Sequence, residues 1–283
     1  MDTGYEALDE KFNMLSAGEV TLLTGPTGVG KTSLAVNIAY NNMTVLNNSV
    51  LYFTLDEGMG ELGERFIHLD TEIPLFRRGN EVKGPEEGGY NESPEDREDI
   101  SKSAEKFQHF LDNDFLKMCD DDEITLADMQ SLICDHFSGF DFVIIDPLEK
   151  IKISREPAGD NSDMVKLIFR ELKKTARSLE VPFLLLSRMD EKEAEKYKEV
   201  TDKIVLLKRH DFCPEKRKWD REMKVKLNCI PEPAILEFIY NATGSRGEHR
   251  FLWEAPLMTF KEHSEEKDKI MSDIFSDLKN SRD

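Results

Sequence analysis

The stretch VTLLTGPTGVGKTS, residues 20–33, decides the fold. It opens with an apolar strand that begins at Val20, and a glycine-rich turn from Gly25 to Gly30 follows. The next apolar residues, from Leu34 to Ile38, fall at helical spacing. The stretch therefore predicts a buried strand, a tight turn and an amphipathic helix, which is the unit from which a parallel sheet covered by helices is built.

The turn itself fits the pattern GxxxxGK[ST], which is typical of loops that bind nucleotide phosphates. In such a loop, backbone N–H groups surround the phosphates, Lys31 reaches the β- and γ-phosphates, and the Thr32 hydroxyl ligates Mg²⁺. The alternative is an ordinary glycine turn. The pattern predicts that ATP and Mg²⁺ bind at these residues: Gly25, Pro26, Thr27, Gly28, Val29, Gly30, Lys31, Thr32 and Ser33.

A second metal ligand is expected at Asp146, which ends the apolar strand predicted for residues 142–145. A carboxylate at the end of a strand beside the phosphate-binding loop is where P-loop proteins hold Mg²⁺. The alternative is a carboxylate that only caps the end of the strand. The pairing of Asp146 with the loop favours the metal site.

Two other predicted strands also end in polar residues. Asp56 and Glu57 follow residues 49–55, and either carboxylate is a candidate to orient or deprotonate the attacking water. Ser187 and Arg188 follow residues 182–186, where a polar pair is suited to sense the γ-phosphate. The alternatives are solvated loop carboxylates in the first case and a surface strand end in the second.

Strand and helix alternate along most of the chain. Apolar runs predict further strands at residues 115–118, 142–145 and 182–186, and stripes at helical spacing predict helices at residues 100–110 and 160–180 and one that Thr125 caps. Residues 203–207, 223–228 and 235–239 are predicted as antiparallel additions at one edge of the sheet. The fold class is therefore α/β, with a mainly parallel sheet, helices on both faces and antiparallel edge strands.

One domain is predicted over residues 1–260. Residues 79–98 are dense in Gly, Pro, Glu and Asn, so a long mobile acidic loop is expected there. Residues 261–283 are predicted as a terminal amphipathic helix, because five apolar residues share one helical face within dense charge: Ile270, Met271, Ile274, Phe275 and Leu278.

Charge and composition limit the class of protein. The 283 residues carry 57 acidic and 38 basic side chains, and the net charge of −19 opposes general adhesion to nucleic acid or anionic membranes. No apolar run approaches the roughly 20 residues that span a bilayer, and the start lacks a basic leader region. The four cysteines stand far apart, which is typical of thiols in a reducing compartment. We expect an intracellular protein without a membrane partner.

Several of these segments together resemble the ATPase domain of DnaB-type replicative DNA helicases, within the RecA-like class of P-loop ATPases. The resemblance extends over roughly residues 3–260, and its carriers are residues 3–10, 15–32, 51–56, 143–149 and 172–188. It implies a RecA-like fold, a homo-oligomeric ring of six subunits and ATP-driven movement along single-stranded DNA. It also implies a cytoplasmic, nucleoid or other DNA-containing location.

The resemblance also implies roles for single residues. Asp56 takes the position of the catalytic glutamate of the family, and Arg188 takes that of its sensor glutamine. The family supplies a Lys-x-Arg pair to the γ-phosphate of a neighbouring subunit, and Lys224 and Lys226 stand at that place. The finger position therefore holds Lys226, a residue without the planar fork of arginine. The alternative for both lysines is a solvated edge strand.

A basic cluster around Trp219 is a candidate contact for single-stranded DNA. The alternative is a solvated surface hairpin, since four carboxylates lie within the same segment. The cluster comprises Lys203, Lys208, Arg209, Lys216, Arg217, Lys218 and Arg221, of which Lys208, Arg209, Arg217 and Lys218 are the predicted DNA-binding residues.

Three classes of function follow. The first is a DnaB-like ATPase, a helicase-type motor that acts on single-stranded DNA. The second is a nucleotide-dependent assembly or signalling ATPase that keeps the fold and the ATP site without translocation. The third is a subunit that needs a separate chain to supply the N-terminal collar of the family or the finger residue. The acidic charge and the lysine at the finger position favour the second class, whereas the extent of the resemblance favours the first.

Overall fold

The computed structural model describes residues 1–73, 77–78, 81–82, 93–135, 139–153, 161–209, 232–254 and 257–262. Within these residues nine strands form one sheet in the order β11-β10-β9-β8-β1-β7-β6-β2-β5. The strands are β1 (Val20–Thr24), β2 (Val50–Thr54), β5 (Leu116–Cys119), β6 (Phe142–Asp146), β7 (Phe183–Leu186), β8 (Lys203–Arg209), β9 (Glu232–Asn241), β10 (Gly247–Glu254) and β11 (Thr259–Glu262). Two short strands, β3 (Arg77–Arg78) and β4 (Glu81–Val82), pair separately.

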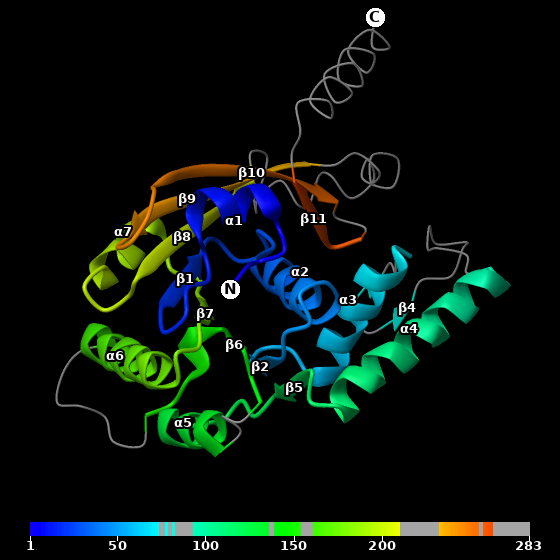
Figure 1. The fold of residues 1–283 in the computed structure, drawn as a ribbon, viewed down its shortest axis with the longest axis horizontal. Coiled ribbons are helices and arrows are strands. Elements are labelled where there is room, and N and C mark those ends of the chain that lie inside the picture. Colours follow the sequence, from blue (N-terminus) through cyan, green and yellow to red (C-terminus); the bar gives the residue numbers. More distant parts are fainter. Residues whose placement is uncertain are drawn as a thin grey trace, which may run out of the picture.

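Helices cover both faces of this sheet. They are α1 (Glu6–Phe12), α2 (Lys31–Thr44), α3 (Met59–Thr71), α4 (Pro94–Asp112), α5 (Leu126–Asp135), α6 (Asn161–Leu179) and α7 (Glu191–Ala194), with short 3₁₀ turns η2 (Leu148–Lys150) and η3 (Glu195–Tyr197). Figure 1 shows α5 and α6 together on one side of the sheet, and α2 on the other. Among the described residues, no helix is long and apolar enough to cross a membrane.

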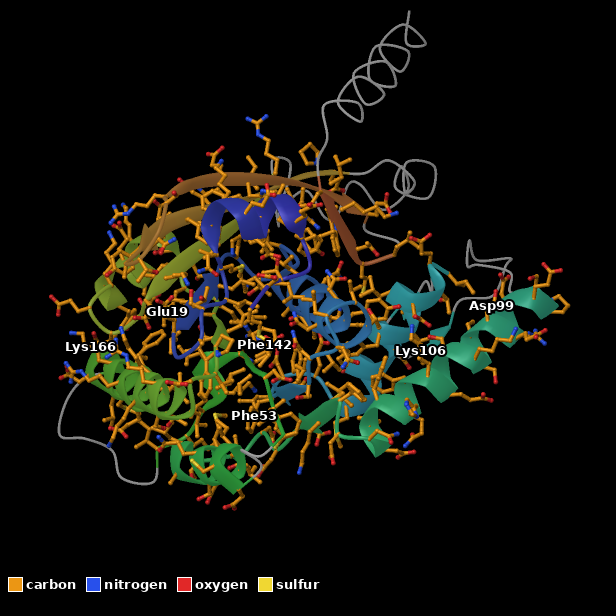
Figure 2. All side chains as sticks on the ribbon, in the orientation of Figure 1. Glu19, Phe53, Asp99, Lys106, Phe142 and Lys166 are labelled. Carbon is orange, nitrogen blue, oxygen red and sulfur yellow. The ribbon has the colours of Figure 1, made fainter. Side chains whose placement is uncertain are left out.

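The strands alternate between two buried clusters, as period-two side-chain placement requires. In β6, Phe142 and Ile144 pack on the side of α2, while Val143 and Ile145 pack on the side of α5 and α6. Figure 2 shows Phe53 and Phe142 in the middle of the molecule, and Asp99 at the outer end of α4. This two-sided burial explains why the central strands are almost entirely apolar.

The expected fold class is confirmed, with one correction to the position of a strand. Strands β8, β1, β7, β6, β2 and β5 run parallel, and β9, β10 and β11 are antiparallel additions. The prediction that residues 203–207 form an antiparallel edge strand is wrong, because β8 lies inside the sheet and is parallel to β1. The chain passes from β7 to β8, on the other side of β1, through α7 and η3, and this crossover keeps β8 parallel to β1.

The expected acidic loop also ends earlier than predicted. Helix α4 begins at Pro94, so residues 94–98 are helical. Ser93 Oγ accepts a hydrogen bond from Asp96 N (3.1 Å), and the Asp96 carboxylate accepts one from Ser93 N (2.6 Å). This capping box, with proline in the first turn, starts the helix within a polar sequence. The expected strand at 223–228 and the terminal helix beyond Glu262 lie outside the described residues.

Asn37 fastens the last described strand to the helix that follows the phosphate-binding loop. Its buried amide nitrogen donates to the carbonyl of Met258 (2.9 Å), and its oxygen accepts from Phe260 N (2.9 Å). The Tyr5 hydroxyl lies 3.2 Å from the same oxygen and 3.1 Å from the Phe260 carbonyl oxygen. Both ends of the described chain therefore meet at α2.

Candidate functional site

The phosphate-binding loop joins β1 to α2, and its backbone depends on two glycines. Gly25 has φ 144°, and a Cβ there would lie 2.7 Å from the carbonyl oxygen of Leu207. Gly30 has φ 110°, and a Cβ there would lie 3.1 Å from the ring of Phe260. These left-handed angles and close approaches exclude a side chain at either position without strain. The loop is therefore built for a backbone that turns tightly around a small anion.

The N-terminus of α2 faces this loop, and no side chain of its N-cap residue competes with a ligand for the N–H groups of the first turn. Gly30 is the N-cap and provides no side-chain hydrogen bond, and the first turn of α2 contains no acidic residue. The N–H groups of a first helical turn have no partner within the helix, and they carry the positive end of its dipole. The helix end can therefore bind a phosphate, in the way that helix N-termini bind anions.

Lys31 is almost completely buried beneath the loop. Its ammonium donates hydrogen bonds to the carbonyl oxygens of Gly25 (2.6 Å) and Pro26 (3.1 Å). Burial lowers the pKa of Lys31 to about 8, while the carboxylates of Asp146 and Glu149 act in the opposite direction. An anion in the loop would favour the charged ammonium, so this lysine is suited to bind a phosphate.

Asp146 lies at the end of β6, beside the start of α2. Its carboxylate accepts hydrogen bonds from the Tyr52 hydroxyl (3.2 Å) and from the Thr32 side chain. Burial raises the pKa of Asp146 to about 6, and the hydrogen bond from Thr32 opposes this rise. A hydroxyl and a carboxylate that touch supply the hard oxygen ligands that Mg²⁺ prefers, so these residues fit the metal that the sequence implies.

The two candidate catalytic carboxylates are each paired with an arginine. Arg65 forms a two-point contact with Glu57, with Nε to Oε2 at 2.8 Å and Nη2 to Oε1 at 2.5 Å. Asp56 binds Arg188 Nη2 and lies 3.6 Å from Lys150 Nζ. Both carboxylates line the same cavity as the phosphate-binding loop. The structure thus brings Asp56, Glu57 and Arg188 together beside Lys31.

Glu149 anchors the backbone from which Arg188 projects. Its Oε1 accepts hydrogen bonds from the Ser187 hydroxyl and from Arg188 N (2.8 Å). The end of β7 is therefore tied to the 3₁₀ turn that follows β6. The Arg188 side chain itself remains 44% exposed, so its backbone is fixed while its guanidinium retains access to the cavity.

The cavity has a volume of about 440 Å³ and extends from the phosphate-binding loop to a wall formed by β8, β9 and β10. In that wall the guanidinium carbon of Arg209 lies 5.8 Å from the centroid of the Trp253 ring, and its Nε lies 3.6 Å from Glu232. Met258 adds a thioether, which Arg65 contacts at 3.0 Å. Pairs of arginine and carboxylate thus occur at three points of the lining.

Sequence reasoning did not identify several residues of this site. Arg65 lies eight residues after Glu57 on a helix whose buried face was not assigned to the site, although an arginine at that distance from a candidate carboxylate was a usable signal. Trp253 lies in a strand with mixed polar and apolar residues, and no motif marks it. Tyr52 is an apolar strand residue by pattern, and only its contact with Asp146 shows another role.

The structure places the described members of the predicted DNA-contacting cluster in different surroundings. Lys203 is completely buried and binds Glu19 at 2.5 Å, so its expected place in a surface cluster is wrong. The expected surface position of Arg209 is also wrong, because its side chain is 10% exposed and lines the phosphate-loop cavity. Lys208 is half-exposed and paired with Glu237. Arg217, Lys218, Lys224 and Lys226 lie outside the described residues.

Known proteins are similar in sequence to most of this chain. Residues 1–225 match the family model described as the DnaB-like helicase C terminal domain. The chain belongs to the family of DnaB-like helicase C-terminal domains. A probable plasmid replicative DNA helicase of Chlamydia psittaci is 25% identical to this member over 197 residues, which cover 68% of the chain and 39% of that helicase. The replicative DNA helicase DnaC of Bacillus subtilis is 28% identical over 192 residues, which cover 66% and 39%. The chain thus spans about two fifths of the length of these relatives.

Solved structures agree with the fold of a DnaB-like domain. One of them, described as an ATPase domain, superposes with a TM-score of 0.74 and 18% identity, covering 93% of this chain and 91% of that domain. A DnaB-like replicative helicase, solved in a study of its interactions with primase, gives a TM-score of 0.73 and 19% identity, covering 93% and 62%. The RecA-like architecture expected from the sequence is confirmed.

Proposed function

We propose that this DnaB-like domain binds and hydrolyses ATP as the motor of a helicase that acts on single-stranded DNA. The observation that supports this most directly is the cavity in which the phosphate-binding loop, Asp146 and the two strand-end carboxylates converge. The family match supports a motor over the assembly or signalling alternative.

The residues of the cavity have separable roles in this proposal. The backbone from Gly25 to Ser33 surrounds the phosphates, and Lys31 leaves the loop carbonyls to bind the β- and γ-phosphates. Asp56 orients the attacking water and accepts its proton, with Glu57 as the alternative. Arg188 senses the γ-phosphate from the end of β7.

Thr32 and Asp146 are the residues that would hold Mg²⁺. When bound, the ion neutralises charge on the phosphate oxygens and so makes the γ-phosphorus easier to attack. The Tyr52 hydroxyl orients the Asp146 carboxylate by its hydrogen bond. The protein supplies the remaining positive charge through Lys31 and Arg188.

Assembly and DNA binding complete the proposal. We place the domain in a homo-oligomeric ring of six, in which Lys224 and Lys226 reach the γ-phosphate of the neighbouring subunit. Lys208, Arg217 and Lys218 are the proposed contacts to DNA phosphates, and the protein then works in a DNA-containing compartment. Turnover by one subunit then depends on the presence of the next.

Phosphate release from ATP and Mg²⁺, with and without single-stranded DNA, tests the proposed function. We expect hydrolysis that DNA stimulates, and we expect Lys31→Ala to remove most nucleotide binding or turnover. Lys152→Ala is a matched control, because Lys152 is 44% exposed and pairs with Glu123 away from the cavity. Unchanged ATP binding and hydrolysis in the Lys31 variant would refute the assignment of the site.

A further inference from the structure

Two cations from different elements contact the same carboxylate at the edge of the phosphate-loop cavity. Arg188, after β7, binds Asp56 Oδ2, and Lys150, at the end of η2, lies 3.6 Å from Asp56 Oδ1. Each oxygen of Asp56 therefore has its own cation. The three side chains are about equally exposed, at 44%, 45% and 42% for Arg188, Lys150 and Asp56. Water competes with both contacts, so neither partner is fixed.

The two cations differ in their access to a nucleotide. Arg188 lines the cavity together with Lys31 and Thr32, and its charge is felt at Lys31. It also lines a second cavity of about 470 Å³, so its side chain has room to move. Lys150 does not belong to the lining of the phosphate-loop cavity. A γ-phosphate on Lys31 would thus attract Arg188 much more strongly than Lys150.

Loss of Arg188 to the phosphate would leave Asp56 beside a polyanion. Glu57 is adjacent to Asp56, and Asp146 lines the same cavity. Asp146 and Glu149 both act on Lys31. Like charges at this range repel an unpaired carboxylate and push it toward solvent. A carboxylate displaced by even about 1 Å loses much of its ability to align a water. A second cation on Asp56 prevents this displacement.

We propose that Lys150 is a positioning residue, which holds the Asp56 carboxylate in place after Arg188 has moved from Asp56 to the γ-phosphate. The inference rests on the proposed function, because it assigns Asp56 to the attacking water. It explains why two cations converge on one carboxylate. Arg188 is the cation that changes partner, and Lys150 is the one that stays.

The test compares Lys150→Ala with Lys152→Ala in single-turnover and steady-state ATP hydrolysis. Both lysines are about half exposed, they are two residues apart, and each has a carboxylate partner. We expect Lys150→Ala to lower kcat about fivefold while the Kd for ATP stays within twofold, since a half-exposed ion pair contributes at most about that factor. Lys150→Arg should restore kcat to within about twofold, whereas Lys152→Ala should change neither quantity.

A double-mutant cycle identifies the residue through which Lys150 acts. In an Asp56→Asn background, Lys150→Ala should have no further effect on kcat, because the carboxylate that it positions is gone. The inference is overturned if Lys150→Ala matches Lys152→Ala, or if it lowers kcat equally with Asn at position 56. Absence of hydrolysis by the unchanged chain would instead overturn the proposed function, and this inference with it.

Discussion

Asn37→Ala tests how firmly β11 and Met258, which lines the cavity, are held to α2. The substitution removes the donor to the Met258 carbonyl and the acceptor for Phe260 N. Tyr5 keeps a partner, because its hydroxyl also lies 3.1 Å from the Phe260 carbonyl oxygen. The buried N–H of Phe260 and the partly buried carbonyl of Met258 therefore lose their partner, and such a loss costs about 1–3 kcal/mol for a buried group. We expect the free energy of unfolding to fall by about 3 kcal/mol.

That loss is large against the roughly 5–15 kcal/mol by which domains are stable. Urea denaturation followed by far-UV circular dichroism measures it, and the midpoint should fall while the slope stays constant. A thermal melt should show a decrease of about 5 °C, since the entropy of unfolding scales with chain length.

Asn113→Ala provides the control for this measurement. Within the described residues, the hydrogen bonds of the Asn113 amide go to His109 in the last turn of α4, in an exposed position. Its removal should change the unfolding free energy by no more than about 0.5 kcal/mol. If Asn37→Ala also changes the unfolding free energy by no more than about 0.5 kcal/mol, Asn37 does not hold β11, and the argument from unpaired backbone groups is refuted.

Three further outcomes are expected. Asp56→Asn should leave ATP binding intact and lower kcat, whereas Glu57→Gln should lower kcat less; the reverse order in a phosphate-release assay would assign the water to Glu57. Mixing Lys226→Ala with Lys31→Ala protein should restore part of the turnover, because an intact loop on one chain meets an intact finger on the next, and a strictly monomeric species in sedimentation with ATP would contradict this. Gly30→Ala should weaken ATP binding at least tenfold in equilibrium titration, since its Cβ would lie 3.1 Å from Phe260 at φ 110°; binding within twofold would show that the loop tolerates a side chain.

The phosphate-binding part of the site was predictable because its chemistry is local in sequence. A glycine pattern of eight residues places the loop, and apolar runs place the strands whose ends carry Asp56, Asp146 and Arg188. Parallel strands bring their carboxyl ends to one edge, so residues about 130 apart meet there, as Asp56 and Arg188 do.

The wall formed by β8, β9 and β10 was not predictable, because its residues are not close together in the sequence. Arg209 and Trp253 come together through the pairing of β8, β9 and β10, and no local pattern specifies that pairing. Lys203 shows a related difficulty. A lysine at the start of a strand suggests an exposed edge, yet Glu19 neutralises it within the sheet, and its burial becomes visible only once that partner is placed.

The contact of Phe260 with α2 also dictates when the ATP cavity can be completed during synthesis. Asn37 and Phe260 are 223 residues apart, and Tyr5 and Phe260 are 255 apart. A ribosome that adds about 5–20 residues per second needs roughly 10–45 s to cover the first of these distances. The phosphate-binding loop itself depends on β7 and β8, which are complete only at Arg209. While the residues between Arg209 and Phe260 are added, the nascent chain can therefore have a phosphate-binding loop whose cavity is still open on one side.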